Sequence, residues 1–255
     1  MRDKNSRFRA IIILVSLVLP ATAFTACGAR ADKVKAPILL FTGTGTSPDD
    51  VNAIETLLAS NHLDFSTLSS SELNAMDEMD LRRYLLLIIP GGNFVTIGNS
   101  LTSATNANVR DAVHNGLNYL GVCAGAFLAG NFPAPYKSFN LTSGVKFGFY
   151  ADENHGIRKA AVPITVAGGP TLEQYWEDGP QLAGWGAVVG KYPDGTPAIV
   201  EGTLGNGWVI LTGVHAEAPE SWRHGMIFNT PATDDNSYAS TLIQAALNRT
   251  SLSHF

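Results

Sequence analysis

The sequence contains few cysteines, no surplus of positive charge and only one long apolar run. Its 255 residues include 2 cysteines, 17 basic and 22 acidic side chains, which give a formal net charge of −5. Two cysteines exclude a fold held together by several disulfides, and the acidic balance argues against binding to rows of nucleic-acid phosphates. Because the apolar run lies at the N-terminus, a membrane protein with several spans is excluded. A hydrophobic content of 45% excludes intrinsic disorder.

The first 26 residues have the composition of a secretory signal peptide. Basic residues precede an apolar core, and Pro20 and small residues follow it. Ala21 and Ala23 fit the A-x-A preference of the general signal peptidase. Alternatively, the four residues that end at Cys27 are similar to a bacterial lipobox, in which Cys27 would carry lipid. An uncleaved anchor is disfavoured, because Pro20 interrupts a run already shorter than the ~20 residues of a spanning helix.

This segment predicts an exported protein in the periplasm or cell envelope, and we favour the lipid-anchored form. Contact with a membrane is then expected only through the lipid on Cys27. Removal of residues 1–26 leaves 13 basic and 21 acidic side chains over 229 residues, a net charge of −8. Such an acidic surface repels nucleic acid and anionic lipid. With Cys27 lipidated, Cys123 is a lone thiol in an oxidising compartment, either buried and inert or retained for its reactivity.

Apolar runs alternate with helical patterns in the first half of the remaining chain. Strands are expected at residues 37–41, 63–68, 84–89 and 119–122, and then at 142–150, 161–167, 185–191, 198–201 and 208–212. Helices are expected from Ser47 onward, at 106–118, from 124 to 129 and at 238–248. Strands that alternate with helices predict a parallel sheet covered on both faces. We therefore expect a tether at 27–36, one α/β domain at 37–249 and a tail at 250–255.

The strongest candidate for chemistry is the segment Gly-Val-Cys-Ala-Gly around Cys123, between an expected strand and an expected helix. A nucleophile on a tight strand-to-helix turn needs small neighbours. Gly121 and Gly125 supply them, as in the Gly-x-Ser-x-Gly elbow. The N-terminal end of the following helix would favour the thiolate form of the cysteine. The alternative is a small, inert cysteine at the end of a buried strand.

A cysteine nucleophile needs a general base and a group that orients the base. His215 follows an expected buried strand, and Glu217 lies two residues further on. Open α/β sheets place their sites at the carboxyl ends of neighbouring strands. An exposed loop histidine is the alternative, and Glu220 is a second candidate for the orienting acid. His155 and His224 lie in loops that could line a pocket, and no histidine spacing supports a metal site.

Pro90-Gly91-Gly92 follows the third expected strand. Glycines let backbone amides point at a bound anion, so we expect Gly91, Gly92 and the amide of Ala124 to bind the oxyanion and the substrate. The same three residues are also an ordinary turn at the end of a strand. The glycines after the first strand lack the third glycine of a dinucleotide-binding loop, so no cofactor is expected.

The glycine loop, the cysteine elbow and the late Gly-Val-His-x-Glu segment, in that order, resemble the class I glutamine amidotransferase-like superfamily. Within it, the sequence is most similar to the N-terminal domain of eukaryotic-type biotin–protein ligases and of stand-alone bacterial proteins. Residues 175–180 and 192–217 support this likeness, which covers nearly all of residues 37–249. The resemblance implies a flavodoxin-like three-layer α/β/α sandwich with a mainly parallel sheet.

The resemblance also implies a triad of Cys123, His215 and Glu217, with two departures from the pattern. Glutamine amidotransferases carry glutamine four residues after the nucleophile, where it holds the substrate glutamine, and this chain has Phe127 there. They also show His-Pro-Glu, whereas this chain has His-Ala-Glu. The first departure argues against glutamine as the substrate, and the second weakens the assignment of Glu217.

Two functions are therefore considered. The first is a cysteine-dependent hydrolase that cleaves an amide or related acyl bond in a small molecule or peptide. The alternative is a non-catalytic module on the same fold that binds a small molecule or peptide, with Phe127, Tyr175 and Trp176 lining an apolar recognition pocket. A purely structural envelope lipoprotein has no specific support in the sequence.

Overall fold

The computed structural model describes residues 36–151 and 158–255. The expected signal peptide, with its cleavage sites and Cys27, lies outside the described residues, and so does His155. No helix in the described part of the chain is long and apolar enough to cross a membrane.

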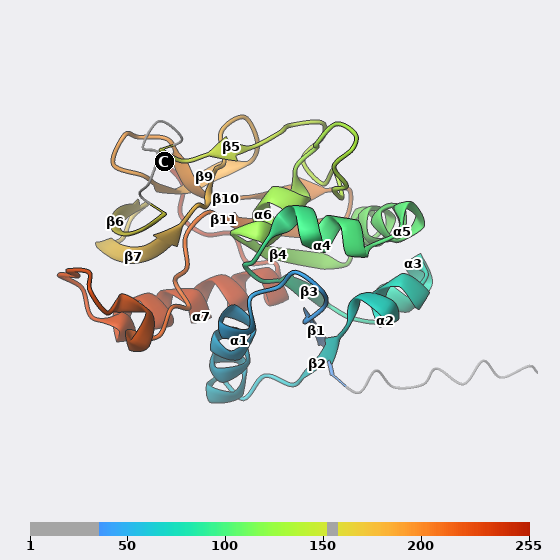
Figure 1. The fold of residues 1–255 in the computed structure, drawn as a ribbon, viewed down its shortest axis with the longest axis horizontal. Helices are drawn as coiled ribbons and strands as arrows, with labels where there is room; N and C mark the ends of the chain where they lie inside the picture. Colours follow the sequence, from blue (N-terminus) through green and yellow to red (C-terminus); the bar gives the residue numbers. More distant parts are fainter. Residues whose placement is uncertain (1–35, 152–157) are drawn as a thin grey trace, which may run out of the picture. The chain divides into compact units, whose positions relative to one another are not determined.

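The core of the domain is one sheet, whose strand order is β2-β1-β3-β4-β11-β10-β9-β6-β7 (Figure 1). Its first five strands are parallel, and the remaining four are joined in antiparallel fashion. The strands are β1 Ile38–Phe41, β2 Phe65–Leu68, β3 Leu86–Ile89, β4 Asn118–Val122, β6 Lys159–Val166, β7 Thr171–Glu177, β9 Ala187–Lys191, β10 Pro197–Leu204 and β11 Gly207–Thr212. A separate antiparallel pair is formed by β5 Gly148–Phe149 and β8 Pro180–Gln181.

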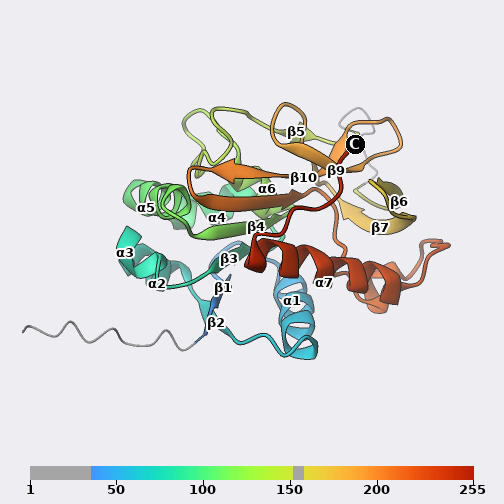
Figure 2. The ribbon, with the colours of Figure 1, turned by 180° about the vertical axis from the view of Figure 1, so that it is seen from behind.

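Helices cover both faces of the parallel half of the sheet. They are α1 Pro48–Ser60, α2 Ser70–Ala75, α3 Glu78–Leu81, α4 Phe94–Ser100, α5 Ser103–His114, α6 Ala124–Ala129 and α7 Ala232–Asn248, with a 3₁₀ turn, η1, at Glu220–Arg223. Both views show α1 and α7 on one side and α4, α5 and α6 on the other (Figures 1 and 2). Strands β1 and β3 are buried along their whole length, as their unbroken apolar sequences require between two helical layers.

The predicted α/β class and three-layer arrangement are confirmed. The order of the five parallel strands, β2-β1-β3-β4-β11, is that of a flavodoxin-like sheet. In such sheets the chain connections change direction between the first and third strands, and the loops at their carboxyl ends open a crevice there. In this chain those loops are residues 42–47 after β1 and 90–93 after β3.

The loop after β1 leads directly into α1 through the predicted helix start. The Ser47 hydroxyl accepts a hydrogen bond from the Asp50 amide at 3.3 Å, and Pro48 occupies the first turn. This cap places Asp50 at the carboxyl end of the sheet, where its side chain is buried. A residue whose sequence context indicated only a helix start is therefore part of the crevice.

The expected strand at 142–150 is wrong, since only Gly148–Phe149 is extended and paired. Ser143 and Gly144 have φ values of +53° and +94°, and the Val145 amide donates to the Thr142 carbonyl at 3.1 Å. These residues form a tight turn, which overrides the β propensity of the apolar residues around them. The last helix also begins at Ala232, six residues before the expected start.

Candidate active site

Cys123 occupies a strained turn between β4 and α6. Its backbone has φ +46° and ψ −99°, a conformation that L residues rarely adopt. The backbone segments around it are in very close contact: a Cβ added to Gly125 would lie 2.1 Å from the Ile89 carbonyl oxygen. A Cβ on Gly121 would lie 2.7 Å from the Gly125 backbone. The predicted need for glycine at both positions thus has a steric cause in the structure.

His215 is fixed just beyond β11 by its backbone and by two aromatic rings. Its amide donates to the Tyr175 carbonyl of β7 at 2.8 Å. The ring centroids of Tyr175 and Trp222 each lie 5.8 Å from that of the imidazole, in edge-to-face arrangements. With only 4% of the residue exposed, the imidazole has little freedom to rotate.

Two buried carboxylates, from Glu217 and Asp50, approach the same imidazole nitrogen. The His215 Nδ1 lies 2.8 Å from Glu217 Oε1 and 3.0 Å from Asp50 Oδ1. A single N–H can be directed well at only one acceptor, and the hydrogen-bond geometry is met by Glu217 and not by Asp50 Oδ1. Glu217 packs behind the ring among aliphatic side chains, whereas Asp50 belongs to the pocket wall.

The two carboxylates differ in their electrostatic state. Burial raises the pKa of Glu217, and the neighbouring His215 charge only partly opposes this. Burial also acts to raise the pKa of Asp50, but attraction to His215 outweighs it and leaves that pKa below its ordinary value. Burial lowers the pKa of His215, yet the charges of Asp50 and Glu217 and a hydrogen bond with Cys123 outweigh burial and raise it well above 6.5. The two carboxylates therefore stabilise the positive charge that the imidazole gains when it accepts a proton, with Asp50 as its charged partner.

These three side chains also form a possible metal-ligand set. One ligand atom from each of Asp50, His215 and Glu217 lies within 4.8 Å of the others. A zinc ion bonded to nitrogen and oxygen at about 2.0–2.2 Å in tetrahedral geometry would hold those atoms about 3.4 Å apart. The observed 2.8 Å between Nδ1 and Oε1 is instead a hydrogen-bond distance, so this position suits a proton better than a metal.

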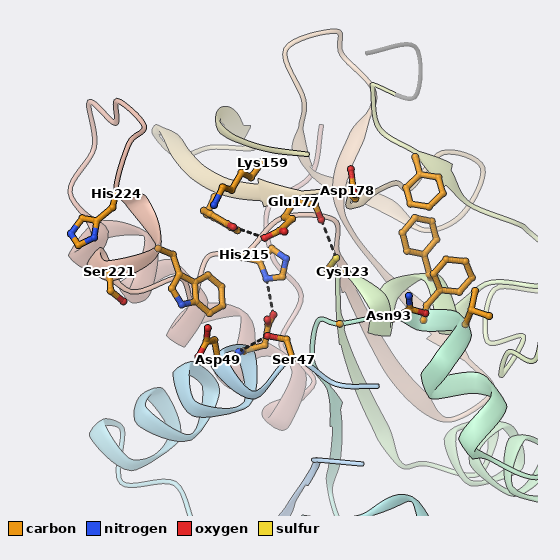
Figure 3. A pocket seen from close by; sticks show the side chains of 18 of the residues that line it. Ser47, Asp49, Asn93, Cys123, Lys159, Glu177, Asp178, His215, Ser221 and His224 are labelled. Atoms are coloured by element: carbon orange, nitrogen blue, oxygen red, sulfur yellow. Dashed lines mark hydrogen bonds and ion pairs between the residues drawn. The ribbon is translucent and has the colours of Figure 1, made fainter. Parts of the chain in front are cut away.

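Cys123 and His215 line the same pocket, which has a volume of about 870 Å³. The second ring nitrogen of His215 faces Cys123 (Figure 3), while the first lies 3.0 Å from Asp50 Oδ1. The thiol donates to the Glu177 carbonyl oxygen at 3.6 Å. The pocket thus contains a thiol on a strained turn beside an imidazole whose far nitrogen is fixed by carboxylates, which is an arrangement suited to nucleophilic catalysis.

Comparison with known proteins agrees with this architecture. Residues 36–158 match the family model of the biotin-protein ligase N-terminal domain. The fold is glutamine amidotransferase-like. It is similar to a solved glutamine amidotransferase, with a TM-score of 0.55 and 17% identity over 79% of this chain and 99% of that chain. It is also similar to PurLQS from Thermotoga maritima, with a TM-score of 0.56 and 17% identity over 86% of this chain and 100% of that chain. The resemblance predicted from the sequence is confirmed, and a search of the curated proteins found no match.

The glutamine amidotransferase-like fold also occurs as part of larger enzymes of another class. A beta-galactosidase from Bacillus circulans sp. alkalophilus matches 82% of this chain over 31% of its own length, with a TM-score of 0.51 and 14% identity. At such low identities the likeness establishes the fold alone, and function has to be argued from the site.

The structure brings most of the remaining predicted site residues to the pocket. Gly92, Phe127 and Tyr175 line it, and Ala124 begins α6 directly after the nucleophile candidate. Gly91 lies beneath the site: a Cβ there would be 2.2 Å from Asp50 Oδ1 and 2.7 Å from His215 Cε1.

Trp176 is not a pocket residue, contrary to the expectation. Successive side chains of a strand point to opposite faces, so Tyr175 faces the site and Trp176 faces the core. Its indole N–H donates to the Gly179 carbonyl at 3.3 Å, and its ring packs edge-to-face on Tyr150. Glu220 is also excluded as the orienting acid, because it is exposed in η1 while Glu217 and Asp50 contact the ring.

Asp50 and Trp222 are two contacts of the His215 ring that sequence reasoning missed. Asp50 was interpreted only as an acid in the first turn of a helix, which hid its role in the site. Trp222 lies in a short 3₁₀ turn with no sequence motif around it. The available signal for Asp50 was its position directly after the first parallel strand, where open α/β sheets form their crevice. His224, which was placed in a possible pocket loop, does line the pocket.

Proposed function

We propose that this protein is a cysteine-dependent hydrolase of an amide or related acyl bond, acting through Cys123, His215 and Glu217. The observation that carries the proposal is the joint exposure of Cys123 and His215 to one pocket, with the far nitrogen of the imidazole 2.8 Å from Glu217. A thiol held only for packing would not need a strained backbone at φ +46°, which costs on the order of 1–3 kcal/mol.

The reaction follows from the positions of these groups. The thiol proton passes to the free ring nitrogen of His215, and the sulfur attacks the carbonyl carbon to form a C–S bond. The oxygen becomes an oxyanion, which in this proposal the backbone amides of Gly92 and Ala124 stabilise. The imidazolium then donates its proton to the leaving nitrogen as the C–N bond breaks. Water, deprotonated by His215, cleaves the thioester, releases the acid and restores the thiol.

Asp50 acts in this proposal as a positioning residue for the base. Its carboxylate, at 3.0 Å from Nδ1, stabilises the imidazolium that forms when the thiol ionises. Glu217 accepts the Nδ1–H and fixes the plane of the ring. Together they direct the other nitrogen at Cys123, so that both stages of the reaction use one orientation of the imidazole.

Labelling of the full chain with iodoacetamide, resolved to each cysteine peptide by mass spectrometry, tests the nucleophile. We expect Cys123 to react faster at pH 7 than free cysteine. Because this reactivity depends on His215 as the base, His215→Ala should slow the labelling strongly. A Cys123 that labels no faster than free cysteine would remove the basis of the proposal. Cys123→Ser separates the hydrolase from a binding module, because only the hydrolase loses all turnover while it retains binding.

The binding module stays as the second candidate because the thiol is largely buried. Cys123 is 6% exposed and donates to a backbone carbonyl, as an inert cysteine would.

We also propose export and lipid anchoring through Cys27, supported by the composition of the first 26 residues. The intact mass of the protein from a bacterial envelope should include an acyl modification, and Cys27→Ser should release the protein in soluble form.

A further inference from the structure

The pocket has two chemically different halves on opposite sides of Cys123. On the His215 side, the lining side chains include Asp49, Lys159 and Glu177, all of them exposed and polar. On the other side, aromatic rings are the main lining, together with Asn93 and Val95. Figure 3 shows this division, with His215 on one side of Cys123 and Asn93, the residue that caps α4, on the other.

The aromatic wall, defined here as Phe94, Phe127, Tyr136 and Phe149, is a continuous cluster. Phe127 stacks on Phe94 with ring centroids 4.8 Å apart and an interplanar angle of 23°, and its centroid is also 4.8 Å from that of Phe149. The centroids of Phe94 and Tyr136 are 6.4 Å apart. Tyr136 is 47% exposed and Phe149 is 40% exposed. Apolar rings that remain accessible inside a concave site are a feature of ligand pockets.

The position of the wall relative to Cys123 is set by α6. Phe127 lies four residues after Cys123, which is one helical turn, and is itself 2% exposed. It therefore forms the rigid base of the wall, while the more exposed rings of Phe149 and Tyr136 surround the space above it. Cys123 and the wall line the same pocket, so a group attached to the sulfur shares one cavity with these rings.

The chemistry of the proposed reaction gives the two halves different roles. His215 donates its proton to the leaving group, so the leaving group must depart on the His215 side of the sulfur. The acyl group stays on sulfur as the thioester and must occupy the space on the opposite side. That space is bounded by the aromatic wall, whereas the charged side chains of Asp49, Lys159 and Glu177 lie on the His215 side.

We propose that the aromatic wall is the acyl subsite, and that the substrate carries an apolar, ring-bearing acyl group joined to a polar leaving amine. This inference rests on the proposed hydrolase function. An acyl group with an aromatic ring would pack against the accessible rings of Phe149 and Tyr136, and the polar amine would face Asp49 and Glu177. A glutamine side chain would leave its amide unpaired against these rings, which is unfavourable in a buried site.

Three acyl-directed electrophiles test the subsite on the full chain. They are the N-acetyl chloromethyl ketones of phenylalanine, alanine and glutamine, each of which places its side chain in the acyl subsite while it alkylates the thiol. We expect Cys123 to react about 10- to 100-fold faster with the phenylalanine probe than with the alanine probe, as burial of a ring should provide. The glutamine probe should be no faster than the alanine probe.

Variants of the wall should remove this preference. Phe127→Gln restores the amide expected in a glutamine amidotransferase, and we expect it to lower the phenylalanine-to-alanine rate ratio at least tenfold. Because Phe127 is buried, Phe149→Ala and Tyr136→Ser provide tests at exposed positions that the fold tolerates more easily. Met79→Ala, which removes a 69% exposed apolar side chain of α3 outside the pocket, is the matched control and should leave the ratio unchanged.

The outcomes distinguish this inference from the proposed function. If iodoacetamide fails to label Cys123 rapidly, the hydrolase proposal is lost and the subsite with it. If iodoacetamide labels Cys123 rapidly but the phenylalanine probe has no advantage, the nucleophile stands and the aromatic acyl subsite is overturned. A preference for the glutamine probe, or an undiminished ratio in Phe149→Ala and Tyr136→Ser, would overturn it as well.

Discussion

Gly91 gives the most direct test of the site geometry, because a single methyl group should displace two of its side chains. A Cβ at this position would lie 2.2 Å from Asp50 Oδ1 and 2.7 Å from His215 Cε1, whereas ordinary contacts begin near 3.4 Å. Both groups are buried and tightly packed, so Gly91→Ala must push the carboxylate away by about 1 Å and shift the imidazole with it. A misplacement of about 1 Å in a catalytic group lowers rates by roughly 10²-fold.

The assay is the second-order rate of Cys123 alkylation by iodoacetamide at pH 7, together with thermal unfolding followed by circular dichroism. We expect Gly91→Ala to lower the rate about 100-fold, or to the level of free cysteine if the wild-type enhancement is smaller. Gly148→Ala is the matched control, because its Cβ would meet nothing closer than Gln181 Nε2 at 3.8 Å. A folded Gly91→Ala protein with the wild-type rate would refute the view that His215 and Asp50 have one fixed arrangement.

Two further predictions concern charge. Asp50→Asn should lower the Cys123 alkylation rate by about 10- to 150-fold, the effect of losing a charge-assisted contact of about 1.5–3 kcal/mol. Glu217→Gln should lower the rate less, because a glutamine carbonyl still accepts the Nδ1–H. A larger loss in Glu217→Gln than in Asp50→Asn would contradict the assignment of Asp50 as the charged partner. Burial raises the pKa of Asp235 to about 7 although Arg223 lies beside it. Because the unfolded group ionises near 3.8, its contribution to the free energy of unfolding is complete below pH 3.8 and is lost as the pH rises through 7. Urea unfolding from pH 4 to 8 should therefore show a steeper decline than in Asp235→Asn, and parallel profiles would exclude this titration.

The parts of the site that sequence reasoning located are those with a local signature. The glycines on either side of Cys123 are required by contacts within a few residues and with the adjacent strand, so their spacing is visible in the sequence. His215 follows a strand whose apolar run marks it as buried. Such features can be predicted because one short segment contains both the residue and the cause of its position.

Features that depend on distant segments were not predicted. Asp50 and His215 are 165 residues apart in the chain and meet only because β1 and β11 end at the same edge of the sheet. The antiparallel half of the sheet combines β10, β9, β6 and β7 in an order that no local pattern specifies. Helix α2 is a different case, because it could have been predicted from local sequence. Ser69 and Glu72 form a capping box that marks its start, although the helix is too short to show hydrophobic periodicity.

The fold by itself does not select a chemistry, because similar sheets occur in a glutamine amidotransferase and within a beta-galactosidase. What distinguishes this chain is the content of two loops at the carboxyl ends of β4 and β11, one with a strained cysteine and one with a histidine fixed by two carboxylates. Strain at Cys123 and burial of three titratable groups both lower stability, and nothing in the packing of the core requires either of them. Their presence at one pocket is therefore better explained by reactivity than by folding, and Cys123→Gly, which removes the strain at φ +46° and keeps the three buried titratable groups, should leave the domain at least as stable as the wild type if this reasoning is right.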